Sequence, residues 1–582
     1  MTDLHRRWPL PPLPLPFRPL PTLLLPIAAM AGTLRGAETD KVVELPPLIV
    51  AEAKNPLAWR YAEAPGLEVL SVCGDSTTQQ FMEQFQHLRQ LLQTVVPPDL
   101  QLSLSAPVVH ILGGNDMRDR LKQDVQEEMF QKPVPDADPG TDVPFAGRGG
   151  FPAPRVRVSV LPNLRLQDTD AYAIFALLDD SQLQKSQLGL TPDYVSFLMQ
   201  RRTPPLPPWF ILGVMRLLPS LAFETRQIEL EPMDWTSGEA AAAVRKDPST
   251  ALLPLADLLV APRQPAAPAA VAAAYHATWL AQSTLFVRWG LDDRNGAREA
   301  FFRFVDRASR EPVTEPLFQE CFGQGYAAMR ERLGRYLPDA MSKTLRLRPA
   351  APLESLSLDL RPATTAEIAR IKGDWERLET GFVKRTFPAL SGKYLDEARR
   401  TLRRAYDQGE RDPRLLAAMG LCECDAGDDG AAEPLLAAAV LARVTRPRAY
   451  AELARILYER ARARPAGPRG KLSTAQTTPI LQPLLAAQRL SPPQAEAAEL
   501  FSDLWFHTEV SPLPTDLDEL NREAGFFPRS LNLDYRTALL DAQAGRWPEA
   551  RRLVARGLAT APTPAGRAPF VELDGLLPPH AP

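Results

Sequence analysis

Residues 391–413 read SGKYLDEARRTLRRAYDQGERDP, and residues 425–447, 34 positions further on, read DAGDDGAAEPLLAAAVLARVTRP. Four residues coincide at this offset: Ala398, Leu402, Ala405 and Pro413 recur as Ala432, Leu436, Ala439 and Pro447. A fixed period of this length is typical of stacked helical hairpins, in which small residues let paired helices approach and a leucine fills the seam. Proline then stops the second helix. The pattern predicts an α-helical array from about residue 375 onward.

A third segment, residues 544–553 (AGRWPEARRL), repeats the order glycine, aromatic residue, Glu-Ala and leucine seen in residues 391–402. This period and composition resemble those of tetratricopeptide repeats (TPR), a family of helical hairpins. The resemblance implies a solenoid over residues 375–582 that binds a protein or peptide partner. Residues 462–520 are irregular and leave the number of repeats open. The alternative is alanine-rich helical packing without a true repeat.

The N-terminal part mixes strands and a helix. Residues 67–72 and 156–160 alternate apolar and polar residues as half-buried strands do, and residues 101–112 are a further strand candidate. Residues 76–94 carry apolar residues at helical spacing, with Ser76 or Thr77 as the cap. Six prolines in residues 131–155 indicate a long surface loop. These features predict an α+β unit.

After residue 164 the strand signal disappears. A Pro/Ala-rich stretch at residues 261–274 predicts a linker or insertion within an otherwise helical block. The segments with apolar residues at helical spacing are 171–178, 194–199, 209–218, 278–289, 297–308 and 326–337.

Composition restricts the function. The 582 residues include 67 lysines and arginines and 70 aspartates and glutamates, with no dense basic stretch, which argues against a nucleic-acid partner. Six widely spaced histidines cannot form an HExxH motif. The Cys422-Glu423-Cys424 pattern has no second pair, so we expect cysteines to pack in the core rather than to bind zinc. The four cysteines are Cys73, Cys321, Cys422 and Cys424.

The N-terminus has the layout of a secretory signal. Arg6 and Arg7 stand near the start, and a Pro/Leu-rich stretch leads from them to an apolar run at residues 20–31. The run ends in the small-residue site Ala29-Met30-Ala31. The run is too short to span a bilayer, which needs about 20 residues. We therefore expect a periplasmic or extracellular protein. The alternative is a disordered proline-rich tail.

Two other patterns have ordinary structural explanations. Residues 323–328 (GQGYAA) fit the GxGxxA pattern of dinucleotide sites, but they follow a helical stretch and predict a turn that starts a helix. The pairs Asp179-Asp180 and Asp428-Asp429 lie in polar stretches, where solvation or helix capping is the usual role.

Residues 191–202 read TPDYVSFLMQRR and residues 206–213 read LPPWFILG. This order is similar to that of the gluzincin metallopeptidases of the peptidase MA superfamily. In that family an HExxH helix precedes a Pro-Pro-Trp and a Glu-Gly pair that opens the next helix. The resemblance covers about residues 67–340.

Zinc-dependent peptide hydrolysis in such a site needs two histidine ligands at positions i and i+4 and a carboxylate ligand from the next helix. It also needs a glutamate that deprotonates the zinc-bound water. Matched to the family motif, the histidine positions are Pro192 and Ser196, the base is Asp193, and the third ligand is Leu212. All three ligands are missing. The resemblance therefore implies a peptidase-like fold with a dead site and no catalytic, cofactor or metal residues. The alternative is a chance Leu-Pro-Pro-Trp loop in a chain with 60 prolines.

The predicted fold class is mainly α: an α+β N-terminal part, an all-α peptidase-like domain and a C-terminal helical repeat solenoid. The predicted segments are a signal peptide (1–31), an N-terminal extension (32–66), an α+β subdomain (67–164), a helical gluzincin-like subdomain lacking HExxH (165–344), a linker (345–374) and TPR-like repeats (375–582).

Three functions fit this organisation. The leading hypothesis is an exported, non-catalytic scaffold that binds a protein or peptide through the array, with no cofactor and no integral membrane span. The alternative is a hydrolase with a rebuilt, non-HExxH site that uses Asp193 with Asp179 or Glu224. A third is a structural envelope component without a discrete ligand. The partner's identity and the oligomeric state stay open.

Overall fold

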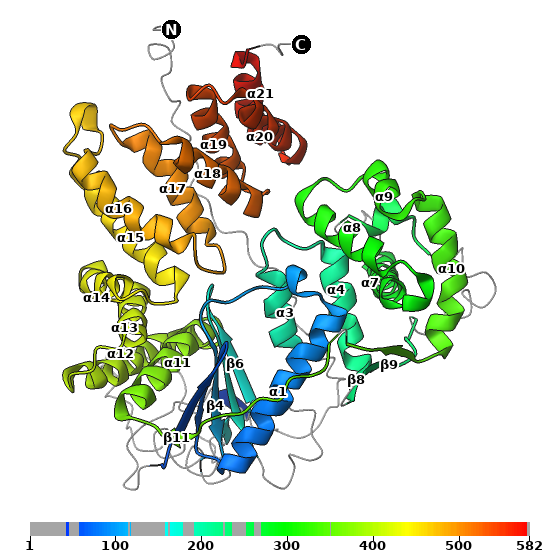
Figure 1. Cartoon of the computed structure of the whole chain (residues 1–582), viewed down its shortest axis with the longest axis horizontal. Helices are drawn as coiled ribbons and strands as arrows, with labels where there is room; N and C mark the ends of the chain where they lie inside the picture. Colours follow the sequence, from blue (N-terminus) through cyan, green and yellow to red (C-terminus); the bar gives the residue numbers. More distant parts are fainter. Residues whose placement is uncertain are drawn as a thin grey trace, which may run out of the picture. The chain divides into compact units, whose positions relative to one another are not determined.

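The computed structural model describes residues 42–45, 57–114, 117, 157–160, 163–178, 191–224, 227–235, 252–260, 269–349 and 351–578. The predicted signal peptide, the proline-rich loop at 131–155 and Asp179-Asp180 lie outside these residues. The predicted fold class is confirmed: a small N-terminal sheet region is followed by helices and a C-terminal helical array (Figure 1). Of the helices in the described part of the chain, none has the length and apolar character that crossing a membrane requires.

A six-stranded sheet forms the N-terminal part, with the strand order β11-β2-β3-β4-β7-β6. β3, β4 and β7 run parallel, and the outer strands pair antiparallel. In the register Leu70 lies opposite Ile111, and Ile111 opposite Phe175. The strands are β2 (Arg60–Ala64), β3 (Leu67–Ser71), β4 (Val108–Gly113), β6 (Asn163–Gln167), β7 (Tyr172–Leu177) and β11 (Arg361–Pro362).

Two helices bury the two faces of this sheet. Because side chains alternate along a strand, Val69 and Ile174 pack with α1 (Asp75–Val95), whereas Leu70 and Phe175 pack with α11 (Thr365–Thr386). The rings of Phe175 and Trp375 of α11 lie 5.8 Å apart. α1 begins after Gly74, which makes no side-chain cap bond, so neither predicted cap residue serves as the cap.

The helical prediction for residues 171–178 is wrong, because this segment contains β7. Every residue of β7 is buried, since the strand lies inside the sheet and both faces are covered. A short apolar run of this kind does not distinguish a central strand from a buried helix. Residues 60–64, placed in the N-terminal extension by the sequence, form β2.

The block after β7 is mainly helical, as predicted. A three-stranded antiparallel sheet of β8 (Leu221–Glu224), β9 (Gln227–Leu230) and β10 (Leu345–Leu347) also belongs to it, so the block is not all-α. A separate two-stranded sheet joins β1 (Val42–Leu45) to β5 (Arg157–Val160). The helices are α3 (Pro192–Gln200), α4 (Pro208–Leu217), α6 (Leu255–Leu258), α7 (Ala269–Leu291), α8 (Arg298–Arg310), α9 (Glu315–Phe322) and α10 (Tyr326–Ser342).

The residues predicted as turns and linkers have defined places. Gly323 has φ +68° and ends α9, and Gly325 caps α10, so the GxGxxA pattern is a turn between helices. Residues 269–274 of the predicted Pro/Ala linker belong to α7, and residues 261–268 lie outside the described part. The segment 345–374, predicted as a linker, instead contains β10, β11 and the start of α11.

Helical hairpins continue from α11 to the end of the described chain. The irregular stretch 462–520 contains α16, α17 and the start of α18, so helices continue through it. After α11 come α12 (Ser391–Asp407), α13 (Pro413–Ala426), α14 (Asp429–Leu441), α15 (Pro447–Ala463), α16 (Thr474–Ala487), α17 (Ala495–His507), α18 (Pro514–Phe526), α19 (Leu531–Gln543), α20 (Trp547–Thr560) and α21 (Pro564–Leu576).

The repeated residues form the seams of the hairpins. The alanines and leucines of the 34-residue pattern are buried on α12 and α14. Leu402 packs on Gly373 of α11, and Leu436 packs on Gly420 of α13; a Cβ on either glycine would lie 2.5 or 2.6 Å from the leucine. Pro413 and Pro447 stand in the first turn of the next helix rather than ending the previous one, because a missing N–H costs nothing there.

Candidate functional site

The four positions matched to the peptidase motif lie on α3 and α4. The Thr191 hydroxyl caps α3 by accepting the Tyr194 N–H at 3.4 Å. Asp193 is exposed on the first turn of α3, and Ser196 is half-buried one turn later. Leu212 of α4 packs against the hydrophobic core. Within the described ranges, no group of three histidine, cysteine, aspartate or glutamate side chains could hold a metal ion.

The rebuilt hydrolytic site has little support in the described side chains. Asp179 and the side chain of Glu224 lie outside them. Asp193 is exposed, and Tyr172 is the buried hydroxyl that responds to its charge. Burial, and to a lesser extent the negative charge of Asp193, raises the pKa of Tyr172 well above its usual value, so this phenol is neutral and not an activated nucleophile near neutral pH. Charged side chains gather instead where the helical array meets the sheet.

A first cluster joins the array to strand β3. Glu68 is 1% exposed and forms an ion pair with Arg370 of α11, whose Nη1 lies 3.1 Å from Oε2. The Tyr61 hydroxyl donates a hydrogen bond to Oε1 at 2.7 Å, and Nη1 of Arg414 on α13 lies 3.3 Å from the same oxygen. Two helices of the array thus share one buried carboxylate of the sheet.

A second cluster surrounds Asp168 and Asp170, which lie between β6 and β7. Arg377 of α11 is 2% exposed and lies 2.9 Å from Asp168. Arg448 of α15 contacts Asp168 at 2.7 Å, and its backbone N–H donates to Asp170 at 2.8 Å. Arg446 lies 3.2 Å from Asp170.

The same arginines also hold acidic residues of the array. Arg377 contacts Asp374 at 2.8 Å and Asp425 of α13 at 3.0 Å. Burial opposes ionisation of Asp374, but the positive charges of Arg377 and Arg446 outweigh it and lower its pKa to about 2. At neutral pH these arginines and carboxylates are therefore charged and paired with one another.

These contacts extend further along the array. The Ser105 N–H donates to the Ser491 carbonyl at 2.8 Å, and the Ser491 N–H donates to the Ser105 hydroxyl at 2.8 Å. The sheet region therefore occupies surfaces of α11, α13 and α15 and the segment before α17. Five arginines at these surfaces already bind carboxylates of the same chain: Arg370, Arg377, Arg414, Arg446 and Arg448.

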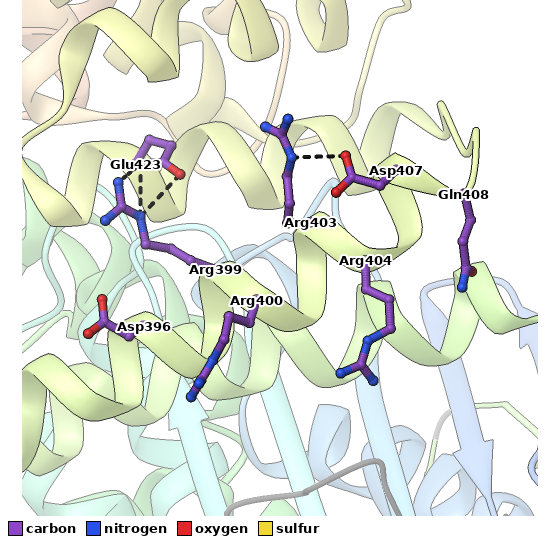
Figure 2. A pocket seen from close by; sticks show the side chains of 8 residues that line it. All are labelled: Asp396, Arg399, Arg400, Arg403, Arg404, Asp407, Gln408 and Glu423. Atoms are coloured by element: carbon purple, nitrogen blue, oxygen red, sulfur yellow. Dashed lines mark hydrogen bonds and ion pairs between the residues drawn. The ribbon is translucent and has the colours of Figure 1, made fainter.

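The outer face of α12 differs, because its arginines remain accessible. A depression of about 870 Å³ lies along this helix. All of the arginines that line it come from α12 (Figure 2). Arg400 is 66% and Arg403 is 64% exposed. The lining residues are Asp396, Arg399, Arg400, Arg403, Arg404, Asp407, Gln408 and Glu423.

The arginines of α12 are oriented by nearby acids. Nε of Arg399 lies 3.0 Å from Oε2 of Glu423 on α13. Arg403 contacts Asp407 at 3.0 Å, and Arg400 pairs with Glu397 one turn earlier. Exposed pairs within one helix are worth only about 0.3–0.5 kcal/mol each, so they orient the guanidinium groups without saturating them.

Beneath α12, α11 carries buried carboxyl groups. Neither carboxyl oxygen of Glu376 has a hydrogen-bond partner among the described residues, and the side chain is 0% exposed. Burial raises its pKa to about 8. Burial also raises the pKa of Glu379 well above its usual value, although Glu379 accepts the Trp375 indole N–H at 2.6 Å. Lys372, one turn before Glu376, has its pKa lowered by burial to about 8.

The other predicted motifs have structural roles. Asp428 caps α14 by accepting the Ala431 N–H at 3.0 Å, and Asp429 pairs with Arg455. The four cysteines are free thiols. Burial raises the pKa of Cys422 and of Cys424 to about 12, as expected for packing residues.

The α12 arginines were not predicted as a site. Their spacing (i, i+1, i+4, i+5) on the polar side of a helix is visible in the sequence. The sequence does not show which arginines form ion pairs with carboxylates of the sheet region.

Comparison with known proteins adds two distant structures. The structure of YrrB, described as a TPR protein with an unusual peptide-binding site, covers 34% of this chain and 90% of its own at 12% identity and a TM-score of 0.25. TTC0263, a thermophilic TPR protein of Thermus thermophilus, covers 34% of this chain and 98% of its own at 18% identity and a TM-score of 0.23. No family model and no curated protein matches the chain. We therefore base the repeat architecture on the helices themselves.

Proposed function

We propose that this protein is a non-catalytic scaffold that binds a protein or peptide partner through its helical array. The accessible, arginine-lined depression on α12 carries the proposal, because the arginines of α11, α13 and α15 at the sheet are already bound to the chain's own carboxylates. Stacked hairpins bury their seams and leave side chains of each helix free for recognition.

The α3–α4 region fits a degenerate, gluzincin-like domain in this proposal. Its support is the order of a capped helix, a Pro-Pro-Trp turn and a second helix, with Pro192, Ser196 and Leu212 at the positions of zinc ligands. None of these side chains can donate the nitrogen or carboxylate oxygen that a zinc site of this type needs. Asp193 then has no metal-bound water to activate.

Export to the periplasm or the exterior is a further part of the proposal, supported by residues 20–31. N-terminal sequencing of the protein recovered from its native cells tests it. A mature chain that starts after Ala31 is expected, and recovery of a chain that starts at Met1 would remove the argument for export.

The test of the scaffold function combines capture and chemistry. The full chain, immobilised, is expected to retain a partner reproducibly from extracts of its own cells, to contain no stoichiometric zinc by mass spectrometry, and to leave peptide substrates intact. Stoichiometric zinc or peptide cleavage that Asp193→Asn abolishes would instead establish the hydrolase. Failure to retain any partner, with altered envelope integrity on deletion, would favour the structural component.

A further inference from the structure

We infer that the depression on α12 binds an extended acidic segment of the partner, in which carboxylates occupy alternate positions. This inference rests on the proposed scaffold function and specifies the partner's chemistry. It is carried by the arrangement of four arginines on one helix over a surface hollow.

The arginines form two rows along α12. Arg399 and Arg403 make one row, and Arg400 and Arg404 make the other. Side chains four residues apart on a helix have Cβ atoms about 5–6 Å apart. In an extended peptide, every second side chain points to the same side at a spacing of about 6.6 Å. Alternate carboxylates of such a peptide can therefore meet successive arginines of a row.

The guanidinium groups of Arg400 and Arg403 have donors left for this role. Arg400 and Arg403 are about two-thirds exposed, and each is paired with an acid of the same helix. A guanidinium offers five N–H donors in a planar fork that matches a carboxylate. Glu423 holds Arg399 from the neighbouring helix and so positions it at the edge of the depression.

The acids around the depression select between classes of anion. Asp396, Asp407 and Glu423 lie among the arginines. They would repel a continuous phosphate backbone, whereas separate carboxylates can sit at the arginines and leave the acids between them. These features favour an acidic peptide over a nucleic acid.

The test uses the full chain and a labelled twelve-residue peptide, capped at both ends, with aspartate at alternate positions and serine or glycine between them. Fluorescence anisotropy gives its Kd. We expect at least tenfold weaker binding for R400Q/R403Q, and weaker binding as salt increases. The matched control R335Q/R348Q removes the same charge from arginines outside the depression: Arg335 is 74% exposed, and Arg348 is also exposed. It should bind as the wild type does.

Three results would overturn the inference. They are an equal loss of binding in the control, equal affinity for a peptide of the same composition with all aspartates in one block, and tighter binding of a single-stranded RNA of the same charge. Circular dichroism checks that both variants are folded. If R400Q/R403Q still retains the natural partner, the scaffold function stands and the α12 site is wrong; if neither protein retains one, the scaffold function itself fails.

Discussion

The buried carboxyl of Glu376 provides a sharp test of the structure. Glu376 lies on α11 between the sheet and α12, and burial raises its pKa from 4.5 to about 8. It is therefore protonated in the folded protein near neutral pH, whereas it ionises above about pH 4.5 in the unfolded chain. Stability linked to Glu376 is full below pH 4.5 and falls as the pH rises towards 8, because unfolding then releases a proton. Glu376→Gln keeps the shape and removes this penalty.

The size of the effect follows from the pKa difference. One pKa unit corresponds to about 1.4 kcal/mol, so a rise from 4.5 to about 8 gives a full effect of about 5 kcal/mol. At pH 8, where about half of the folded molecules still carry the proton, the upper limit is about 4 kcal/mol. Relaxation around the ionised group reduces this, and we expect Glu376→Gln to stabilise the protein by roughly 1–3 kcal/mol at pH 8 and by less than about 0.5 kcal/mol at pH 4.5. The neighbouring Lys372 has a pKa that is lowered from 10.5 to about 8. Its contribution to the free energy of unfolding therefore changes between pH 8 and 10.5 and not between the two pH values compared.

The assay is urea denaturation at pH 4.5 and at pH 8, in which circular dichroism monitors the unfolding. The matched control is Glu410→Gln, which changes an exposed glutamate just after α12. The reasoning is refuted if Glu376→Gln stabilises equally at both pH values, or if it destabilises the protein at pH 8. The first result would mean that the gain is unrelated to protonation. The second would mean that an ionised Glu376 has a partner.

Three further predictions concern the same interfaces. Arg377→Leu leaves the mostly buried carboxylates of Asp168 and Asp374 short of positive charge and should lower the free energy of unfolding by about 3–5 kcal/mol. Arg335→Leu should change it by less than about 0.5 kcal/mol. Urea denaturation at pH 7 compares the two variants. Gly373→Ala would place a Cβ 2.5 Å from Leu402 and should cost about 1–3 kcal/mol, while Gly381→Ala, with no atom within 4 Å, should stabilise α11 by up to about 1 kcal/mol; equal effects of the two changes would contradict the packing. The wild type should have a higher Tm at pH 5 than at pH 8, because burial also raises the pKa of Glu523 to about 7 and of Asp534 to about 6; a flat or rising profile would contradict this.

The array could be predicted from the sequence because its packing is local. Leu402 and Leu436 meet helices that are close in the chain, so a short period in small and apolar residues records the contact. Other correct predictions also depend on residues that are close in the chain. They are the turn at Gly323, the helix cap at Asp428 and the cysteines that pack as free thiols.

The contacts that the sequence did not reveal are long-range. Glu68 and Arg370 are about 300 residues apart in the chain, and neither belongs to a motif. The sequence pattern of residues 171–178 predicts a helix rather than β7, because a strand that is covered on both faces shows no alternation of apolar and polar residues. The boundary at residue 375 divides α11. Its sheet-covering side chains lie on both sides of that residue, with Ile368 and Ile371 before it and Leu378 and Phe382 after it. These contacts are long-range and leave no repeat signal in the sequence.

α11 belongs to two layers at once, and this has a consequence for binding. One side of the helix packs Ile371 and Trp375 on the sheet, and the other packs Gly373 against Leu402 of α12. The arginines of α12 therefore stand on a helix that is fixed, through α11, to a six-stranded sheet. A recognition surface gains affinity when its side chains are held before the partner arrives, because less freedom is then lost on binding. In the proposed function, the ion pairs between the sheet and the array would hold the α12 arginines in place without themselves contacting the partner.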